Sequence, residues 1–272
     1  MPRRSSLLAA LAGAAGATVT AAGRMGGGRA LGPRLHVPVP LAVGARVDLA
    51  DEMRHYLYSV MRVKSGKPCR LFNAADGEFE ATVERLDRKA GELSIVSQLR
   101  PAPAHVGGPT LLFGVLKGSR LPMVIEKATE LGVHTLQPIV SEYCSARDVN
   151  LVRLTAIATE AAEQSGRLTV PRVLAPKPLL EALAEWDSAV PLCACDERGG
   201  GVSLAQADVG SSPGVLIGPE GGFSPAEFEV LSRMGCVTLV SLGANILRAE
   251  TAALAALAVL GMKAERPPSS GG

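Results

Sequence analysis

Two short loops near the carboxyl end of the chain combine glycine with charged residues in a pattern that suits a ligand site. Each loop directly follows an apolar segment with the character of a β-strand, 215–217 and 237–242. The first loop reads Gly218-Pro219-Glu220-Gly221-Gly222, and the second reads Gly243-Ala244-Asn245-Ile246-Leu247-Arg248. Glycine lets backbone N–H and C=O groups touch a ligand with no side chain between them. The pair therefore predicts a binding site built mostly from backbone.

Arg248 and Glu250 form a charged pair immediately after the second loop. An ordinary ion pair at a helix start is the alternative interpretation, and it would add little stability. Three familiar motifs are absent: the phosphate-binding G-x-x-x-x-G-K-[ST] loop, the dinucleotide-binding G-x-G-x-x-G loop and the G-x-S-x-G nucleophile elbow. Nucleotide hydrolysis, Rossmann-type cofactor binding and α/β-hydrolase chemistry are therefore not indicated.

The elements around these loops alternate between strand and helix patterns. Strands are expected at 111–116, 135–140, 172–174, 191–195, 215–217 and 237–242, and helices at 121–131, 150–165, 179–186 and from Ser224 onward. Ser224-Pro225-Ala226-Glu227 is a typical helix start, with an N-cap serine, an early proline and a capping-box glutamate. The alternation predicts a parallel sheet covered by helices, with ligands beyond the carboxyl ends of the strands.

The segment from Leu35 to Pro103 has a different pattern. Short alternating strands are expected at 35–37, 46–49, 68–72, 79–86 and 93–98, with one helix at 52–61. Such strands, separated by Gly, Asp and Asn turns, predict a small barrel or sandwich. Proline and glycine then interrupt the chain. We therefore expect domains at 35–103 and 110–263, joined by a linker at 104–109.

The two ends of the chain differ in composition from its middle. The chain has 272 residues and a net charge of +2, and residues 1–34 contain five arginines and no acid. The remainder is mildly acidic, so any nucleic-acid surface must be a local patch. We expect residues 1–34 to be a disordered or targeting extension and 264–272 to be a disordered tail. A secretory signal, a transit peptide and a start at Met25 remain open.

Cysteine and histidine are too scattered to indicate a metal site. The five cysteines and four histidines include no C-x-x-C pair or zinc-type spacing, so we expect no metal. An odd cysteine count without a framework fits a reducing compartment. No segment is apolar for long enough to span a bilayer, so we expect no membrane partner.

The tandem loops belong to a set of motifs that resembles one family. The stretches 217–223 (IGPEGGF) and 241–252 (SLGANILRAETA) look like the two C-terminal signature loops of the 16S rRNA uracil-1498 N3-methyltransferases. Further similar stretches lie at 54–66, 116–132 and 160–172. The resemblance implies a PUA-like β-barrel followed by a SPOUT α/β domain with a C-terminal trefoil knot. It also implies S-adenosylmethionine as cofactor.

The resemblance also implies the residues of the site. The cofactor-binding candidates are Gly218, Pro219, Glu220, Gly221, Gly222, Leu242, Gly243, Ile246, Leu247 and Cys195. Arg248 would stabilise the uracil anion that forms when N3 loses its proton. Glu220 or Glu250 would accept that proton or orient the base, with no choice between them.

RNA contacts are expected on both domains. The stretch 53–75 is basic, lacks acidic residues and contains interleaved aromatic rings, which suits phosphates and bases. The RNA-binding candidates are Arg54, Arg62, Lys64, Arg70, Lys117, Arg120, Lys127, Gln164 and Arg167. For Lys127, a local ion pair with Glu130 is the alternative.

The implied partner is 16S rRNA or the small ribosomal subunit, and the implied assembly is a homodimer. Leu254, Leu257 and Leu260 could lie at its interface or belong to the core. Methylation of another RNA site and a catalytically silent ribosome assembly factor are the alternative functions. The expected compartment is the bacterial cytoplasm, or an organelle if the extension is a transit peptide.

Overall fold

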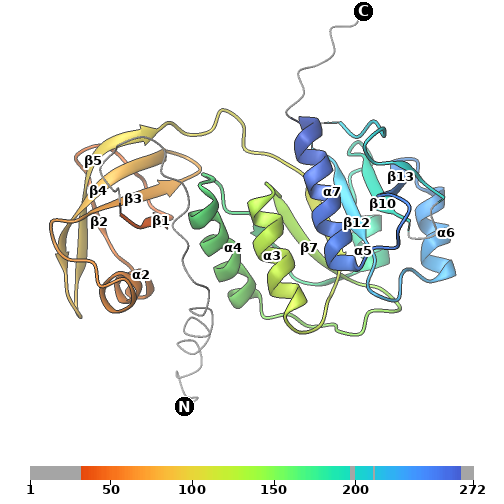
Figure 1. Cartoon of the computed structure of the whole chain (residues 1–272), viewed down its shortest axis with the longest axis horizontal. Helices are drawn as coiled ribbons and strands as arrows, with labels where there is room; N and C mark the ends of the chain where they lie inside the picture. Colours follow the sequence, from red (N-terminus) through yellow and green to blue (C-terminus); the bar gives the residue numbers. More distant parts are fainter. Residues whose placement is uncertain (1–31, 197–199, 211, 265–272) are drawn as a thin grey trace, which may run out of the picture.

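The short alternating strands near the start of the chain pair into one five-stranded sheet (Figure 1). The computed structural model describes residues 32–196, 200–210 and 212–264. The sheet has the order β1-β3-β4-β5-β2. Its strands are β1 (Arg34–His36), β2 (Arg46–Asp48), β3 (Pro68–Asn73), β4 (Gly77–Leu86) and β5 (Gly91–Arg100). Alternate side chains of these strands, including Leu71, Val83 and Leu93, are buried in a single apolar cluster.

Two details of this half differ from the sequence-based expectation. Arg34 is buried within β1, so the folded part begins before residue 35. The helix expected at 52–61 is divided into an α-helix, α2 (Asp51–His55), and a π-helix, Tyr56–Val60. The expected extension before residue 32 lies outside the described residues.

The second half is a parallel sheet with the order β11-β13-β10-β12-β6-β7-β8, and β9 pairs with β7. Its strands are β6 (Thr110–Gly114), β7 (Thr135–Val140), β8 (Arg172–Val173), β9 (Lys177–Pro178), β10 (Leu192–Cys195), β11 (Val202–Ser203), β12 (Gly214–Ile217) and β13 (Val237–Ser241). The two-residue strands β9 and β11 carry no periodicity, so the sequence did not reveal them. The division into domains at 35–103 and 110–263 stays a prediction.

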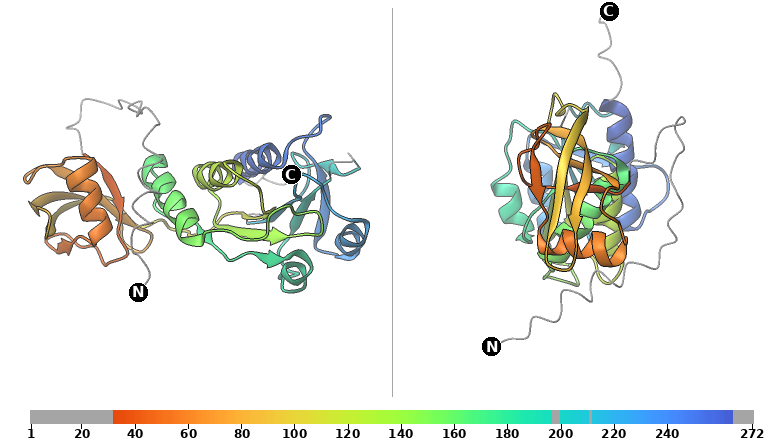
Figure 2. Two further views of the ribbon diagram at one scale, coloured as in Figure 1. Left: turned by 90° about the horizontal axis from the view of Figure 1, so that it is seen from below. Right: turned by 90° about the vertical axis from the view of Figure 1, so that its left-hand side faces the viewer.

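Five helices cover the two faces of this sheet (Figure 2). They are α3 (Arg120–Glu130), α4 (Leu151–Ser165), α5 (Leu179–Ala184), α6 (Pro225–Arg233) and α7 (Ala249–Ala264). Helices α3 and α7 pack against each other on one face, and α4 packs beside α3, whereas α5 and α6 cover the other face. The expected N-caps are observed, since Asn150 caps α4 and Ser224 forms a full capping box with Glu227.

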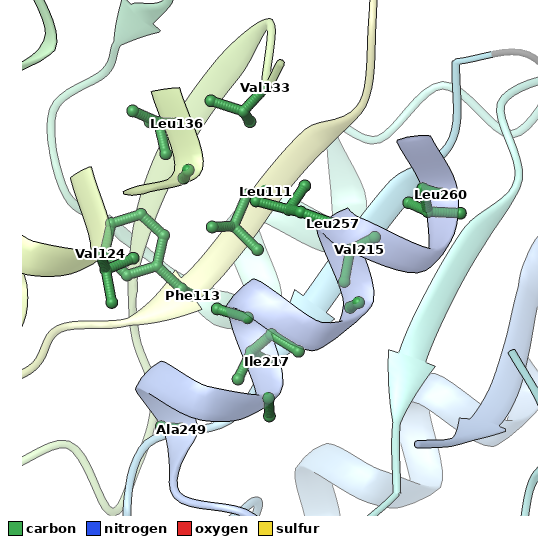
Figure 3. Close-up of a cluster of buried hydrophobic side chains, with 14 of the residues drawn as sticks. Leu111, Phe113, Val124, Val133, Leu136, Val215, Ile217, Ala249, Leu257 and Leu260 are labelled. Atoms are coloured by element: carbon green, nitrogen blue, oxygen red, sulfur yellow. The ribbon is translucent and has the colours of Figure 1, made fainter. Parts of the chain in front are cut away.

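Helix α7 returns across the sheet after β13. It packs on β12 and β6, although β10 separates β13 from β12. A trefoil knot, which the resemblance implies, requires the chain to pass back across the sheet in this way. Leu257 and Leu260 of α7 pack against Leu111 and Val215 in the main core (Figure 3). These two leucines are therefore core residues, which decides between the two roles considered for them.

The two halves meet where β1 lies against the end of α4. The Arg34 guanidinium donates to the carbonyl groups of Ala162 at 2.8 Å and Arg167 at 2.7 Å, and to Glu78 at 3.0 Å. Arg100 donates to Glu78 and to the Gly166 carbonyl. The last carbonyls of a helix have no partner within it and carry partial negative charge. Guanidinium groups of the first half therefore cap a helix of the second.

Candidate cofactor site at the carboxyl edge of the sheet

The parallel pairing brings the two glycine-rich loops to one edge of the sheet. Strand β10 pairs with both β12 and β13, so Ile217, Cys195 and Ser241 end three neighbouring strands. The loops that follow β12 and β13 leave from this carboxyl edge, as the sequence predicted. This is the edge at which open α/β sheets bind ligands.

The first loop is held tightly by its neighbours. Pro219 is buried, and a Cβ added at Gly114 would lie 2.6 Å from the Pro219 nitrogen, so only glycine fits at the end of β6. Gly222 has a φ of 70°, which favours glycine. Gly221 lies against Tyr143, where an added Cβ would be 2.9 Å from the tyrosine Cβ. The loop therefore approaches its surroundings through backbone rather than side chains.

Glu227 anchors this loop to the chain that follows β7. One carboxylate oxygen accepts from the Ser224 N–H at 2.9 Å, and the other accepts from the Glu142 N–H at 2.8 Å. The sequence identified Glu227 only as a capping-box residue, because its second contact spans 85 residues. Tyr143 was missed altogether, since nothing in the sequence places it beside the loop.

Glu220 forms an ion pair with Arg120, the first residue of α3, at 2.7 Å. About a third of each side chain is exposed. A candidate catalytic residue and a candidate RNA-binding residue are thus brought together from positions a hundred residues apart. Lys117 lies nearby in the chain, exposed in the loop between β6 and α3. This part of the edge is polar and open to solvent.

The second loop presents apolar side chains to the core. Leu242, Leu247 and Cys195 are partly buried and pack against the main apolar cluster. Burial raises the pKa of the Cys195 thiol to about 12, so the group is neutral at physiological pH. Gly243 has a φ of 131°. Ile246 differs from the other candidates because 82% of it is exposed, so the described residues leave most of its apolar surface uncovered.

Arg248 and Glu250 occupy contrasting environments at the start of α7. Arg248 is exposed and has no ion pair or side-chain hydrogen bond within residues 32–264 as described. Glu250 is only 8% exposed, and its Oε2 atom is buried with no hydrogen-bond partner in the described chain. A buried acceptor without a partner costs about 1–3 kcal/mol, more if it is charged. Such a group indicates a ligand that supplies the missing donor.

The RNA-binding candidates do not form one continuous patch. Arg62 and Lys64 are exposed around a surface hollow, while Arg54 pairs with Asp51 and Arg70 lies 3.5 Å from Glu78. Lys127 pairs with both Glu126 and Glu130, which confirms the local ion pair considered for it. Gln164 is exposed on α4.

Arg167 is placed differently from the other RNA-binding candidates. Its guanidinium donates to the carbonyls of Thr129, in the last turn of α3, at 2.6 Å and of Val133, beyond the helix, at 2.9 Å. Burial lowers its pKa to about 10, so it remains charged near neutral pH. Arg167 therefore caps the end of α3, and the RNA contact expected for it stays a prediction.

The described residues contain no group of three or more His, Cys, Asp or Glu side chains that could hold a metal ion. No helix in the described part of the chain is both long and apolar enough to cross a membrane.

The parallel sheet, its loops at the carboxyl edge and the preceding antiparallel sheet define an RNA methyltransferase with an N-terminal PUA domain. Residues 105–261 match the RNA methyltransferase domain family, and residues 49–96 match the RNA methyltransferase PUA domain family. The chain therefore belongs to the RNA methyltransferase family, and its PUA-like and SPOUT halves confirm the predicted fold class.

Individual relatives carry a more specific name. The chain is 33% identical to ribosomal RNA small subunit methyltransferase E of Rickettsia conorii, over 83% of this chain and 93% of the relative. It is 32% identical to the protein of that name from Bacillus subtilis, covering 80% and 90%. A crystal structure of this enzyme from Neisseria gonorrhoeae, bound to S-adenosyl methionine, matches with a TM-score of 0.78 and 32% identity, covering 85% of this chain and 97% of that one.

Proposed function

We propose that this protein transfers a methyl group from S-adenosylmethionine to N3 of a uridine in small-subunit rRNA, at the equivalent of position 1498 of 16S rRNA. The observation that carries the proposal is the carboxyl edge itself. Two glycine loops follow β12 and β13, on either side of β10. Beside them, Arg248 is exposed without an ion pair to any described residue, and Glu250 is buried with one oxygen that has no partner in the described chain. The named relatives match over nearly their full lengths, which supports the same activity in this chain.

The residues at this edge fit the chemistry of the cofactor. Apolar surfaces of Leu242 and Leu247 suit an adenine ring, and the neutral Cys195 thiol beside them brings no charge. The backbone at Gly218, Gly221 and Gly243 is at least partly exposed, so it can meet the polar edges of the ligand. When bound, S-adenosylmethionine supplies an electrophilic methyl group on a sulfonium. Such a transfer needs no Lewis acid, so the proposed reaction requires no metal.

Arg248 and Glu250 are suited to activating uracil N3, which must lose its proton and form a stabilised anion. N3 carries a proton at neutral pH, and it becomes nucleophilic only when that proton is lost. The guanidinium of Arg248 stabilises the negative charge that then develops on the uracil oxygens. The unpaired Oε2 of Glu250 accepts the N3 proton. We prefer Glu250 to Glu220 for this role because the Glu220 carboxylate is already paired with Arg120.

The decisive experiment is mass spectrometry of small-subunit rRNA from a strain that lacks the protein. We expect 3-methyluridine to disappear at one site and to return when the wild-type chain is restored. Restoring a Glu250→Gln chain should leave the site unmethylated, whereas a Glu220→Gln chain should restore at least part of it. Unchanged 3-methyluridine in the deletion strain would refute the proposed reaction.

Calorimetry with S-adenosylmethionine separates this function from the alternatives. A catalytically silent assembly factor would bind no cofactor. A methyltransferase with another target would bind it, but the deletion would remove a different modified nucleotide.

We further propose that the protein is a homodimer in the bacterial cytoplasm. Ile246 supports a partner at the second loop, since an isoleucine that is 82% exposed leaves apolar surface uncovered. Light scattering tests this assembly: an Ile246→Asp chain should shift from dimer to monomer, and a monomeric wild-type chain would contradict it.

A further inference from the structure

The turn that follows α2 has two unusual backbone features. The chain forms a π-helix at Tyr56–Val60, and Arg62 then adopts a φ of 52°. Among the described residues, Arg62 alone of the non-glycine residues has a positive φ. The Met61 N–H donates to the Tyr56 carbonyl at 2.9 Å, and Leu57 is fully buried, so the turn is held in place. Both features are energetically unfavourable, and both gather at functional sites.

This backbone arranges polar and aromatic side chains around a surface hollow of about 340 Å³. Tyr58, Arg62 and Lys64 line the hollow together with the hydroxyl-bearing Ser59 and Ser65. Small-ligand sites have volumes of about 300–1,000 Å³, so the hollow matches a ligand the size of one nucleotide. A duplex would instead need an extended groove or a flat basic face.

The two cations of the hollow have no anionic partner among the residues that the structure describes. Neither Arg62 nor Lys64 forms an ion pair with any described residue, whereas the nearby Arg54 is paired with Asp51 at 2.6 Å. Residues 53–75 contain no acid, so the local potential is positive. Tyr58 is 38% exposed, so its ring is available for stacking. Unpaired cations beside an available aromatic ring suit a ligand with both a phosphate and a planar base.

We infer that this hollow, the Tyr58 hollow, binds one unpaired nucleotide of the RNA, distinct from the uridine that is methylated. Arg62 and Lys64 contact its phosphate, and the ring of Tyr58 stacks on its base. The serine hydroxyls are hydrogen-bonding partners for the ribose 2′-OH, which distinguishes RNA from DNA. Helix α2 lies in the five-stranded half and the cofactor loops lie in the other (Figure 1), so the site is separate. The inference rests on RNA being the substrate, and it names a second contact with that RNA.

The test is fluorescence anisotropy with a labelled single-stranded oligouridine, measured over a range of salt concentrations with the full chain. Arg62→Gly keeps a residue that tolerates the positive φ while removing the charge, and Lys64→Gln removes the second charge. Each should lower the slope of log K against log salt by about 0.7. Tyr58→Ala should weaken binding roughly ten-fold without changing the slope, because stacking releases no counterions. Tyr58→Phe should bind as the wild type does.

Controls separate this site from the reaction and from general basic charge. Arg46→Gln removes an exposed arginine elsewhere in the same half, with a side chain that is 74% exposed, and should leave the slope unchanged. All variants should bind S-adenosylmethionine as the wild type does, which shows that the cofactor half is intact, and should unfold at the wild-type denaturant midpoint, which shows that the five-stranded half is folded. Unchanged slopes in both charge variants, or equal competition by double-stranded RNA, would overturn the nucleotide site. A wild type that binds oligouridine yet transfers no methyl group would instead overturn the proposed reaction.

Discussion

Arginine and glutamate occur both at the junction between the two halves and at the carboxyl edge of the sheet, but their environments differ. At the junction Arg34 is buried, and its guanidinium reaches three backbone carbonyls and Glu78 while stacking 3.5 Å from the Phe72 ring centroid. At the edge Arg248 is exposed and has no ion pair with any described residue, and Glu250 is buried with one oxygen that has no partner in the described chain.

The difference separates two kinds of charged residue. A guanidinium whose donors are satisfied by the protein stabilises the fold and offers a ligand little. A charged group whose hydrogen-bonding atoms have no partner in the folded protein can instead bind a ligand. Arg167 and Arg248 were both functional candidates in the sequence, and only their surroundings distinguish them.

Removing the buried arginine of the junction should give the largest effect. Arg34→Ala leaves the carbonyls of Ala162 and Arg167 without this donor and breaks the buried pair with Glu78, which keeps Arg100 as a partner. Breaking a buried ion pair costs about 3–5 kcal/mol, and the remaining Arg100 contact places the expected loss at the lower end of that range. Chemical denaturation should show this loss in the free energy of unfolding. Arg248→Ala is the matched control, since an exposed, unpaired arginine should change stability by less than about 0.5 kcal/mol. Equal losses in the free energy of unfolding of the two variants would show that the junction and the carboxyl edge do not differ in this way.

Removing the arginine of the carboxyl edge should affect the reaction instead. Arg248→Ala should lower kcat for methyl transfer by about 100–1,000-fold, the effect of losing one donor to a developing oxyanion. The dissociation constant for S-adenosylmethionine should change little, as calorimetry can show. Arg147→Ala, at another exposed arginine, should retain wild-type turnover. Wild-type turnover in Arg248→Ala would remove it from the mechanism.

The junction should also respond to pH. Burial raises the pKa of Glu163 from 4.5 to about 7, although one of its oxygens accepts from the His36 N–H at 3.0 Å. A carboxyl with a raised pKa contributes stability below about pH 4.5, and this is lost as the pH rises through about 7. Glu163→Gln keeps the acceptor and removes the charge. Above pH 7 it should be more stable than the wild type, on the order of 1–3 kcal/mol. Parallel stability curves over this range would show that Glu163 does not titrate in this way.

The partly exposed ion pair at the edge should have the smallest effect on stability. Glu220→Gln removes the partner of Arg120, and such pairs contribute about 0–1 kcal/mol. We expect little change in the melting temperature and a moderate loss of methyl transfer, because Arg120 loses its orientation. Arg233→Ala, which breaks the solvent-exposed pair with Glu229 on α6, is the control with neither effect. A large loss of stability would show that Glu220 stabilises the fold, as the residues of the junction do.

The sequence determined the order of elements and the position of the cofactor loops. Local signals sufficed for these, because alternating apolar residues, the Ser224 capping box and glycine at strand ends act over a few residues. The helix at 52–61 was found, but its conversion to a π-helix was not, since burial of Leu57 rather than local propensity fixes that turn.

Tertiary structure alone decided which charged side chains are available to bind a ligand. Arg34 meets Ala162 across 128 residues, and Glu227 meets Glu142 across 85. Such contacts depend on which elements pack together, and neither residue spacing nor composition records that. The sequence by itself therefore determined that Arg248, Glu250 and Arg167 stand in functional motifs. Only the packed structure decided that the first two remain unsatisfied while the third is engaged in capping a helix, because hydrogen-bond partners are set by contacts between distant segments.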